Sequence, residues 1–188
     1  EKHGTLIWDR AVIMFNIAAL ETSLAAECSP TDRAACKKAV GHYQTAAGLL
    51  GILRQLVESQ NFATVDLSNS MLIFWEKLSI AQAQNNIYRM AALAGDSTKH
   101  TTLAYLSKSA NKLFNEALTA AQEPRLLSEV PKQAEEWGAY CKAASMLAAA
   151  KATYHQAVTH RLAHEWGKEI AALAECATKL ASLQAFCK

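Results

Sequence analysis

The sequence predicts an all-α protein, and three observations lead to that fold class. The chain is rich in Ala and Leu but has only 7 Gly and 3 Pro in 188 residues, which favours long helices joined by few turns. Apolar residues recur at three- and four-residue spacing along most of the chain, and no stretch alternates apolar and polar residues as a half-buried strand does. The length suits one well-packed core, so we expect a single helical domain over residues 1–188.

The charge balance and the cysteines narrow the classes of partner. With 19 Lys and Arg against 17 Asp and Glu, the formal charge is +2 and the basic residues cluster only mildly, so no nucleic-acid partner is expected. No run of about twenty apolar residues is free of charge, which argues against a membrane span. The five cysteines form no C-x-x-C pair and leave one over, a pattern typical of a reduced, cytoplasmic protein.

Helix signals divide the first third of the chain. A first helix is expected over residues 6–27. Ser29 as N-cap, with Pro30 in the first helical position and Asp32 in the third, gives a capping box and starts a second helix that reaches Ser59. A glycine in a helix interior costs about 1 kcal/mol relative to Ala, so three glycines kept in this helix predict close backbone packing against a neighbour. They are Gly41, Gly48 and Gly51.

The stretch from Thr64 to Ala91 predicts a central helix, capped by Asp66 or Ser68 and ended by Gly95. It carries two apolar stripes. The first consists of Met71, Phe74, Trp75, Leu78 and Ala81, and the second of Ile80, Ala83, Ile87 and Met90. A helix covered on only one side needs a single stripe. This helix is therefore expected to lie between two neighbours, or between a neighbour and a bound partner.

The remaining periodicity predicts the second half of the array. One helix spans residues 101–122, and after a break at Pro124 and a short connector, a long helix runs from Pro131 to about Ala163. Residues 152–186 have the pattern of a helical hairpin of the tetratricopeptide kind, with Gly167 near its turn. The chain is expected to form antiparallel helical hairpins in a curved, tetratricopeptide-like array of about six helices.

Histidines near the C-terminal end give the strongest sign of a metal site. His160 and His164 are four residues apart and share a helix face, as metal-ligand pairs do, and His155, Glu165 and Glu169 are close in sequence. The supporting shell of such a site is not identifiable, and histidines at a surface or a helix cap are the favoured interpretation. No phosphate loop or carboxylate pair stands out. No catalytic residue, metal or cofactor is therefore assigned, and a metal-dependent enzyme is the weakest functional class.

Four stretches of the chain carry a family resemblance. They are DRAVIMFNIAALETSLAAE at 9–27, KKAVGHYQTAAGLLGILR at 37–54, TVDLS to IAQAQNNIY at 64–88, and YHQAVTHRLAHEWGKEIAAL at 154–173. The short signatures FN-x-AAL, HYQ-x-A-x-G, AQAQ and YHQ to G-x-E-I occur in them in a family's order and approximate separations. The chain resembles the Bro domain (Bro-one domain) of the Alix, rhophilin and His-domain tyrosine phosphatase type. It is similar to the central helical part, without the family's N-terminal and C-terminal segments.

The resemblance implies a protein-interaction function without enzymatic activity. Bro domains of this type bind the C-terminal amphipathic helix of an ESCRT-III subunit of the Snf-seven class, on an apolar patch with a charged rim. By the resemblance, the patch positions fall on Ile87, Met90, Thr102 and Leu106, with Leu103 as a substitute for Thr102, and the rim positions fall on Asp32, Arg33 and Lys37. From spacing alone, the favoured interpretation of Ile87 and Leu106 is that they are core residues.

These expectations combine into an adaptor of the multivesicular body pathway that is cytoplasmic and endosome-associated. Peripheral contact with the endosomal membrane is left open. The alternative is a scaffold or small-GTPase effector module, which the rhophilin type suggests. Apolar surface that the family's flanking segments cover is expected to be exposed or paired here, so self-association is also expected.

Overall fold

The computed structural model describes residues 6–58, 64–95 and 99–188, and within these ranges the chain forms seven α-helices, one 3-10 helix and no strand. The helices are α1 (Leu6–Glu27), α2 (Arg33–Glu58), α3 (Asn69–Ala92), α4 (His100–Ala121), α5 (Pro124–Glu129), α6 (Pro131–Leu162) and α7 (Trp166–Phe186), with the 3-10 helix η1 at Val65–Leu67. The six long helices confirm the predicted all-α array. The expected connector after Pro124 is the short helix α5, and Ser59, the expected end of the second helix, lies outside the described residues.

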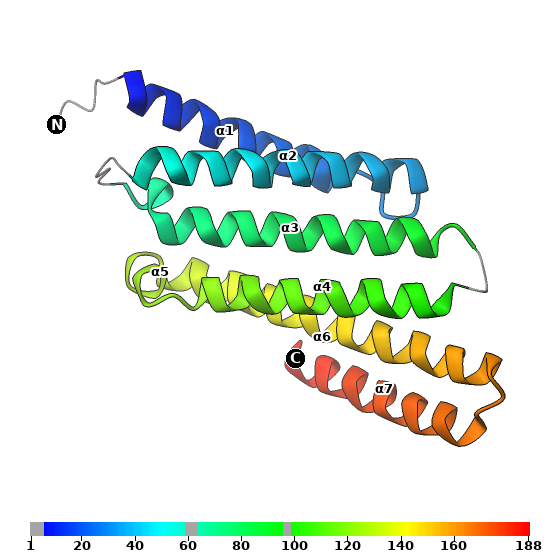
Figure 1. Ribbon diagram of the computed structural model, residues 1–188. Coiled ribbons are helices and arrows are strands. Elements are labelled where there is room, and N and C mark those ends of the chain that lie inside the picture. Colours follow the sequence, from blue (N-terminus) through cyan, green and yellow to red (C-terminus); the bar gives the residue numbers. More distant parts are fainter. Residues whose placement is uncertain (1–5, 59–63, 96–98) are drawn as a thin grey trace.

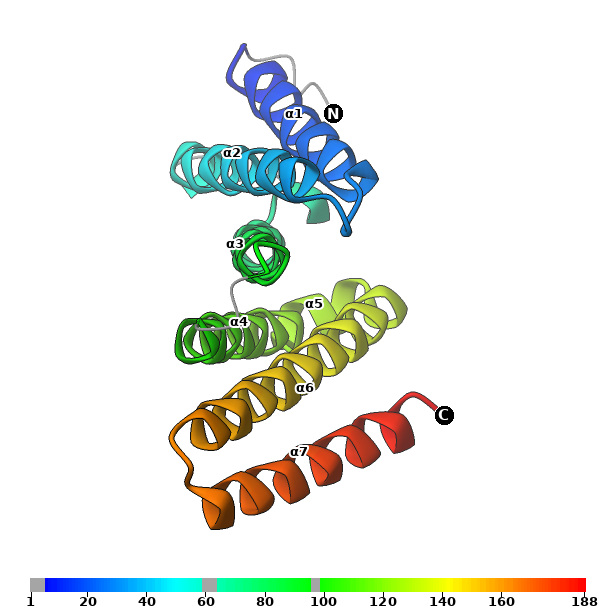
Figure 2. The same cartoon turned by 90° about the vertical axis from the view of Figure 1, so that its right-hand side faces the viewer.

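Successive long helices lie side by side and run antiparallel, in the order α1, α2, α3, α4, α6, α7 (Figure 1). Figure 2 looks almost straight down α3, while α1, α6 and α7 cross that direction at an angle. The array therefore turns along its length instead of forming a flat layer. Because neighbours are antiparallel, the first turns of α2, the last turns of α3 and the first turns of α4 lie at one end of the array.

Two helix starts show how side chains set the element boundaries. The backbone amides of Ala34 and Ala35 donate to the Asp32 carboxylate over 3.2 and 3.0 Å, so Asp32 caps α2. The expected N-cap, Ser29, instead shares a 3.0 Å hydrogen bond with the Thr31 hydroxyl, and the capping-box prediction was wrong. Of the two caps expected for α3, Ser68 is confirmed, since the Met71 amide donates to its hydroxyl over 3.3 Å. The helix ends at Ala92 with Leu93 as its C-cap, so the C-cap prediction for Gly95 was wrong.

The glycine prediction for α2 was wrong, because a Cβ atom would fit at Gly41, Gly48 and Gly51 without displacing a neighbouring atom. A Cβ atom built on Gly51 would lie 3.5 Å from a carboxylate oxygen of Glu76 on α3, whereas one built on Gly41 or Gly48 would meet no atom within 4 Å. Both of these glycines are exposed. They leave a stretch of α2 backbone open to solvent instead of marking a close helix contact.

The core lies on both sides of α3. Toward α1 and α2 it contains Ala18, Leu50, Leu53 and Leu72, and toward α4, α5 and α6 it contains Met71, Phe74, Ala117, Leu126 and Cys141. Trp75 packs against both clusters. Its ring and that of Phe74 lie against Trp137 of α6, with ring centroids 5.1 and 5.0 Å from that of Trp137. The central position predicted for this helix is confirmed.

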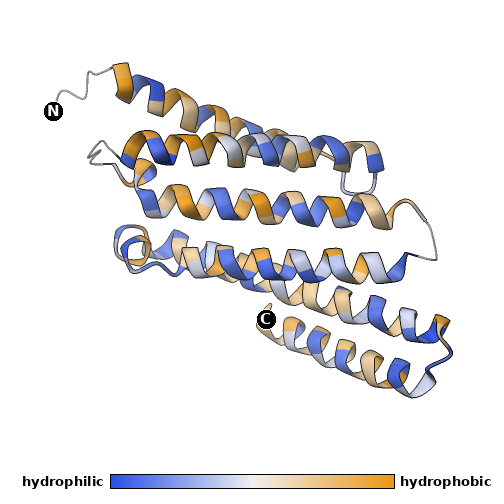
Figure 3. Ribbon diagram, in the orientation of Figure 1, coloured by the Kyte–Doolittle hydropathy of each residue, from blue (hydrophilic) through white to orange (hydrophobic). Residues whose placement is uncertain are grey.

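The two edge helices keep apolar residues on their outer sides. Ile13 and Leu20 of α1 are each 58% exposed, and Ile170 of α7 is 69% exposed. Figure 3 shows apolar residues along the length of α1, interrupted by hydrophilic residues. Within the described residues, no helix combines the length and the apolar character that a membrane crossing requires.

Candidate functional site

The side of α3 that carries Ile80 and Ile87 is open, and it forms the candidate site together with the adjoining sides of α2 and α4. We call this surface the α2–α4 face. At one end of it a cavity of about 160 Å³ is lined by Arg54, Glu76, Lys77, Ile80, Leu113 and Glu116. Ile80 is 39% exposed and Leu113 is half-buried. The floor of this cavity is thus apolar, and its walls are charged.

Two ion pairs form those walls by joining neighbouring helices. Arg54 Nη1 lies 3.4 Å from Glu76 Oε2, which links α2 to α3. Lys77 Nζ lies 3.4 Å from Glu116 Oε2, which links α3 to α4. Because these side chains are partly exposed, each pair contributes about 1 kcal/mol at most. Their main effect is to leave Ile80 and Leu113 facing each other between two neutralised rims.

A side-chain amide fixes the register of α3 against α4 further along the face. Gln84 Nε2 donates to the backbone carbonyl oxygen of Leu106 over 3.3 Å. Ile87 lies one turn beyond Gln84 on α3, and both Ile87 and Leu106 are half-buried. The bond therefore holds Leu106 of α4 beside the turn of α3 that precedes Ile87. Ile87 and Leu106 are two of the residues predicted for the partner-binding patch.

The other predicted patch residues are placed less favourably. Leu103 is only 6% exposed and belongs to the interior of the array, so it does not offer the surface expected of a substitute for Thr102. Thr102 itself is exposed. Met90 is half-buried and is rotated about 60° around α3 from Ile87. Of the predicted floor, Ile87 and Leu106 remain the best placed.

The predicted rim residues lie in and just before the first turns of α2, at the end of the array where α3 finishes and α4 begins. Arg33 and Lys37 are exposed. Asp32 is also exposed, but its carboxylate already accepts two backbone amides of α2. Asp32 therefore has a structural role whether or not a partner contacts it.

A buried polar cluster supports this end of the face from behind. His155 of α6 is 6% exposed. Its Nε2 lies 3.0 Å from the Tyr88 hydroxyl and its Nδ1 lies 2.9 Å from Nδ1 of His100. Burial lowers the pKa of His155 to about 4, with His100 and Lys151 adding to the effect. A neutral imidazole of α6 therefore joins α3 through Tyr88 and α4 through His100.

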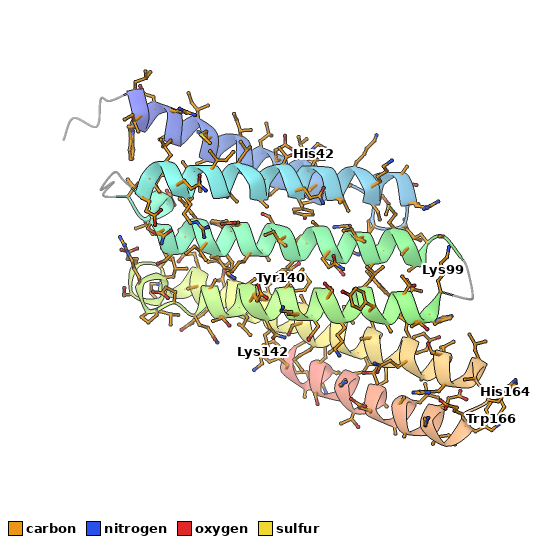
Figure 4. All side chains as sticks on the ribbon, viewed as in Figure 1. His42, Lys99, Tyr140, Lys142, His164 and Trp166 are labelled. Atoms are coloured by element: carbon orange, nitrogen blue, oxygen red, sulfur yellow. The ribbon has the colours of Figure 1, made fainter. Side chains whose placement is uncertain are left out.

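The sequence gives no sign of that role, because the partners of His155, Tyr88 and His100, are distant from it along the chain. The structure separates them. His160 Nδ1 pairs with Glu165 Oε2 at 2.7 Å, and His164, with φ 57°, forms the turn before α7 and lies beside Trp166 (Figure 4). Glu169 accepts a 2.6 Å bond from Arg161. Within the described ranges, no three His, Cys, Asp or Glu side chains are grouped as metal ligands, and all five cysteines are free thiols.

An antiparallel helical array with an open, mixed apolar and charged face is typical of a helical interaction domain. The chain belongs to the BRO1-like domain family, whose model matches residues 2–187. The family resemblance inferred from the four sequence stretches is thereby confirmed. BRO1-like domains are protein-interaction domains, and this coarse class applies to the chain.

Individual relatives agree with the family match. The chain is 29% identical to human programmed cell death 6-interacting protein over 176 residues, which is 93% of this chain and 19% of that protein. It is 30% identical to mouse rhophilin-2 over 109 residues, 58% of this chain and 16% of that protein. It is 27% identical to the pH-response regulator protein palA/RIM20 of Emericella nidulans, covering 88% of this chain and 19% of that protein. The chain thus spans about a fifth of the length of these relatives.

Solved structures show the same fold. The ALIX BRO1 domain in its complex with CHMP4C superposes with a TM-score of 0.87 at 26% identity, covering 96% of this chain and 49% of that one. ALIX in complex with the SIVmac239 PYKEVTEDL late domain gives a TM-score of 0.85 at 27% identity, covering 95% of this chain and 25% of that one.

Proposed function

We propose that this domain is a non-enzymatic adaptor of endosomal sorting that binds the C-terminal amphipathic helix of an ESCRT-III subunit on its α2–α4 face. The similar ALIX BRO1 domain is known in a complex with CHMP4C, which supports this class of partner. On this proposal the protein acts in the cytoplasm at the endosome, in the multivesicular body pathway.

The proposal rests on two pairs of apolar residues, which we call rungs: Ile80 with Leu113, and Ile87 with Leu106. Ile80 and Ile87 on α3 are seven residues apart, as are Leu106 and Leu113 on α4. Ile80 and Leu113 line the same cavity, while the bond from Gln84 to Leu106 holds Leu106 beside the turn that precedes Ile87. Each rung thus contains one residue from each helix, and the two rungs are about 10 Å apart.

That spacing fits an amphipathic helix. A partner helix with apolar residues one heptad apart presents them about 10 Å apart along one side, so two successive anchors can rest on the two rungs. Arg33 and Lys37 are exposed cations at the end of the array where α3 finishes. At the other end of the face, Arg54 and Lys77 are already paired with Glu76 and Glu116. The proposal therefore expects acidic residues on the part of the partner helix that lies near the start of α2.

The test is a titration of a fluorescent ESCRT-III C-terminal helix peptide onto the protein and its variants. Ile87→Asp is expected to weaken binding about tenfold or more, because it places a charge on the apolar floor. Ile170→Asp, on the exposed outer side of α7, is the matched control and should bind as the unchanged protein does. Circular dichroism confirms that both variants are folded. Equal affinity of the Ile87→Asp and Ile170→Asp variants would contradict the proposal that the peptide binds to this face.

The similarity to rhophilin-2 supports a second candidate function. A scaffold or small-GTPase effector module would bind a GTPase in a nucleotide-dependent way. Pull-down with a panel of GTPases loaded with GDP or with a non-hydrolysable GTP analogue separates the two proposals. Nucleotide-dependent capture together with no binding of the ESCRT-III peptide would favour the effector function.

A further inference from the structure

A second cavity lies on the far side of α3 from Ile87. It measures about 350 Å³, and its lining includes Asn85 and Arg89 of α3, Tyr140, Leu147 and Lys151 of α6, and Leu183 near the end of α7. Arg89 is two residues after Ile87, which rotates it about 200° around the helix. The cavity is therefore separate from the α2–α4 face.

Two cations line this cavity without a carboxylate. None of the ion pairs formed within the described residues includes Arg89 or Lys151. Arg89 Nη1 donates weakly to the Asn86 side-chain oxygen at 3.5 Å, and Lys151 Nζ lies 5.0 Å from the centre of the Tyr88 ring. Both cations are half-buried. Neither has the anionic partner that a partly desolvated charge requires.

The two charges also oppose each other. Burial lowers the pKa of Lys151, and the positive charge of Arg89 adds to that shift. An anion placed between them would relieve the repulsion and accept charge-assisted hydrogen bonds from both. Arg89 in particular offers a planar donor group that suits a carboxylate.

The rest of the cavity favours a peptide over a free ion. Its floor is apolar, formed by Ala143, Ala144 and Leu147 of α6. Tyr140, Leu147 and Tyr154 follow one another at seven-residue steps along α6, with exposed fractions of 48%, 39% and 48%. Tyr140, labelled in Figure 4, accepts a hydrogen bond from Gln82 that holds its hydroxyl in place. Partly exposed tyrosines next to an apolar floor and an unpaired arginine are typical of protein-binding surfaces.

We propose that this cavity binds an acidic peptide segment of a partner protein. One Asp or Glu carboxylate of the segment is held between Arg89 and Lys151, and a neighbouring apolar side chain rests on Leu147 and Ala144. The site is independent of the proposed ESCRT-III binding on the α2–α4 face. The domain would then hold two partners at once on opposite sides of α3.

The probe for this site is a short synthetic peptide with Leu residues one heptad apart and Glu residues between them, compared with the same peptide in which Gln replaces every Glu. Binding is measured by isothermal titration calorimetry. The Glu peptide is expected to bind, and the Gln peptide to bind about tenfold or more weakly, because it cannot neutralise the two cations. The double variant Arg89→Gln, Lys151→Gln should lose the preference for Glu. Lys132→Gln, at an exposed position of α6 away from the cavity, should keep it.

Further variants separate the possible outcomes. Leu147→Ser should weaken both peptides, and Ile87→Asp should leave the binding of the Glu peptide unchanged, which distinguishes this site from the α2–α4 face. Equal binding of the two peptides, equal binding by the double variant, or no binding of the Glu peptide at millimolar concentration would overturn the proposal. Light scattering of the double variant tests whether a second copy of the chain occupies the cavity instead. If the unchanged protein self-associates and this variant does not, a second copy fills the cavity and the proposal is wrong.

Discussion

The Tyr88 hydroxyl lies 3.0 Å from Nε2 of His155, so α3 and α6 are joined by a hydrogen bond to a buried imidazole. The groups around that imidazole are His100 of α4, with the ring of Tyr154 and the ammonium group of Lys151 from α6 itself. No carboxylate is among them. Protonation of His155 would therefore place a positive charge beside other donors in a buried site, which the fold opposes.

This arrangement predicts that acid destabilises the protein. The pKa of His155 is lowered from 6.5 to about 4 in the folded protein, so between these values the unfolded chain binds more protons than the folded one. The contribution is fully present above about pH 6.5 and is lost as the pH falls toward 4, by up to about 3 kcal/mol. Urea denaturation between pH 7.5 and 4.5 measures it. His155→Gln removes the titrating group, and an equal pH slope in that variant would contradict the assignment.

Core substitution at Phe74 should be among the most damaging changes. Its side chain is fully buried and its ring stacks on that of Trp137 with a centroid separation of 5.0 Å. Phe74→Ala removes this contact between α3 and α6 and leaves a cavity, which costs about 3 to 5 kcal/mol. Ile17→Ala, on a 42% exposed side chain of α1, should cost about 0.5 kcal/mol or less. Denaturant midpoints compare the two variants, and similar losses would contradict the described core.

Asp32 allows its capping role and its proposed rim role to be separated. Asp32→Ala should destabilise the protein by about 1 kcal/mol, because two amides of α2 lose their acceptor. Ser29→Ala should have little effect on stability, contrary to the prediction from the sequence. Asp32→Asn keeps an acceptor for the amides but removes the charge. If Asp32 also contacts the partner, this variant should keep the melting temperature and change the affinity for the ESCRT-III peptide. Unchanged affinity would show that Asp32 only caps α2.

The sequence could predict the helices well because their signals are local. The periodic apolar residues predict the observed bounds of α1, and Ser68 was one of the two caps expected for α3. The start of α2 was misplaced because Ser29 and Asp32 can both accept amide bonds, and only backbone geometry decides between them. The glycine prediction failed because spacing does not show which side of a helix stays open or how closely a neighbouring helix approaches.

The candidate site could not be predicted as fully, because it depends on how neighbouring helices are aligned. The spacing of residues within one helix does not determine that alignment. The seven-residue steps from Ile80 to Ile87 and from Leu106 to Leu113 are visible in the sequence, but their alignment depends on the register that Gln84 fixes. Leu103 was expected to substitute for Thr102, but the structure places it in the interior. Arg89 and Lys151 come from distant parts of the chain, and neither stands out alone. Their shared cavity appears only when α3 and α6 are brought together.

The edge helices predict self-association. Ile13, Ile17, Leu20 and Leu24 of α1 follow one another at three- and four-residue steps and are 58%, 42%, 58% and 38% exposed, which gives one apolar stripe. Such a stripe gains free energy by leaving water, at about 25 cal/mol for each Å² buried. Light scattering at increasing concentration should therefore show species larger than a monomer.

Introducing charged residues into the stripe tests whether the stripe causes the self-association. The double variant Ile13→Lys, Leu20→Lys places two positive charges on the outer side of α1 without touching the core, so it should lower the average mass and leave the melting temperature nearly unchanged. Gln55→Lys, at an exposed position of α2, adds charge away from the stripe and should behave as the unchanged protein does. A monomer at all concentrations for the unchanged protein would contradict the prediction. Equal association of the two variants would show that the contact lies on another surface. The outer side of α7, which carries Ile170, would be tested next.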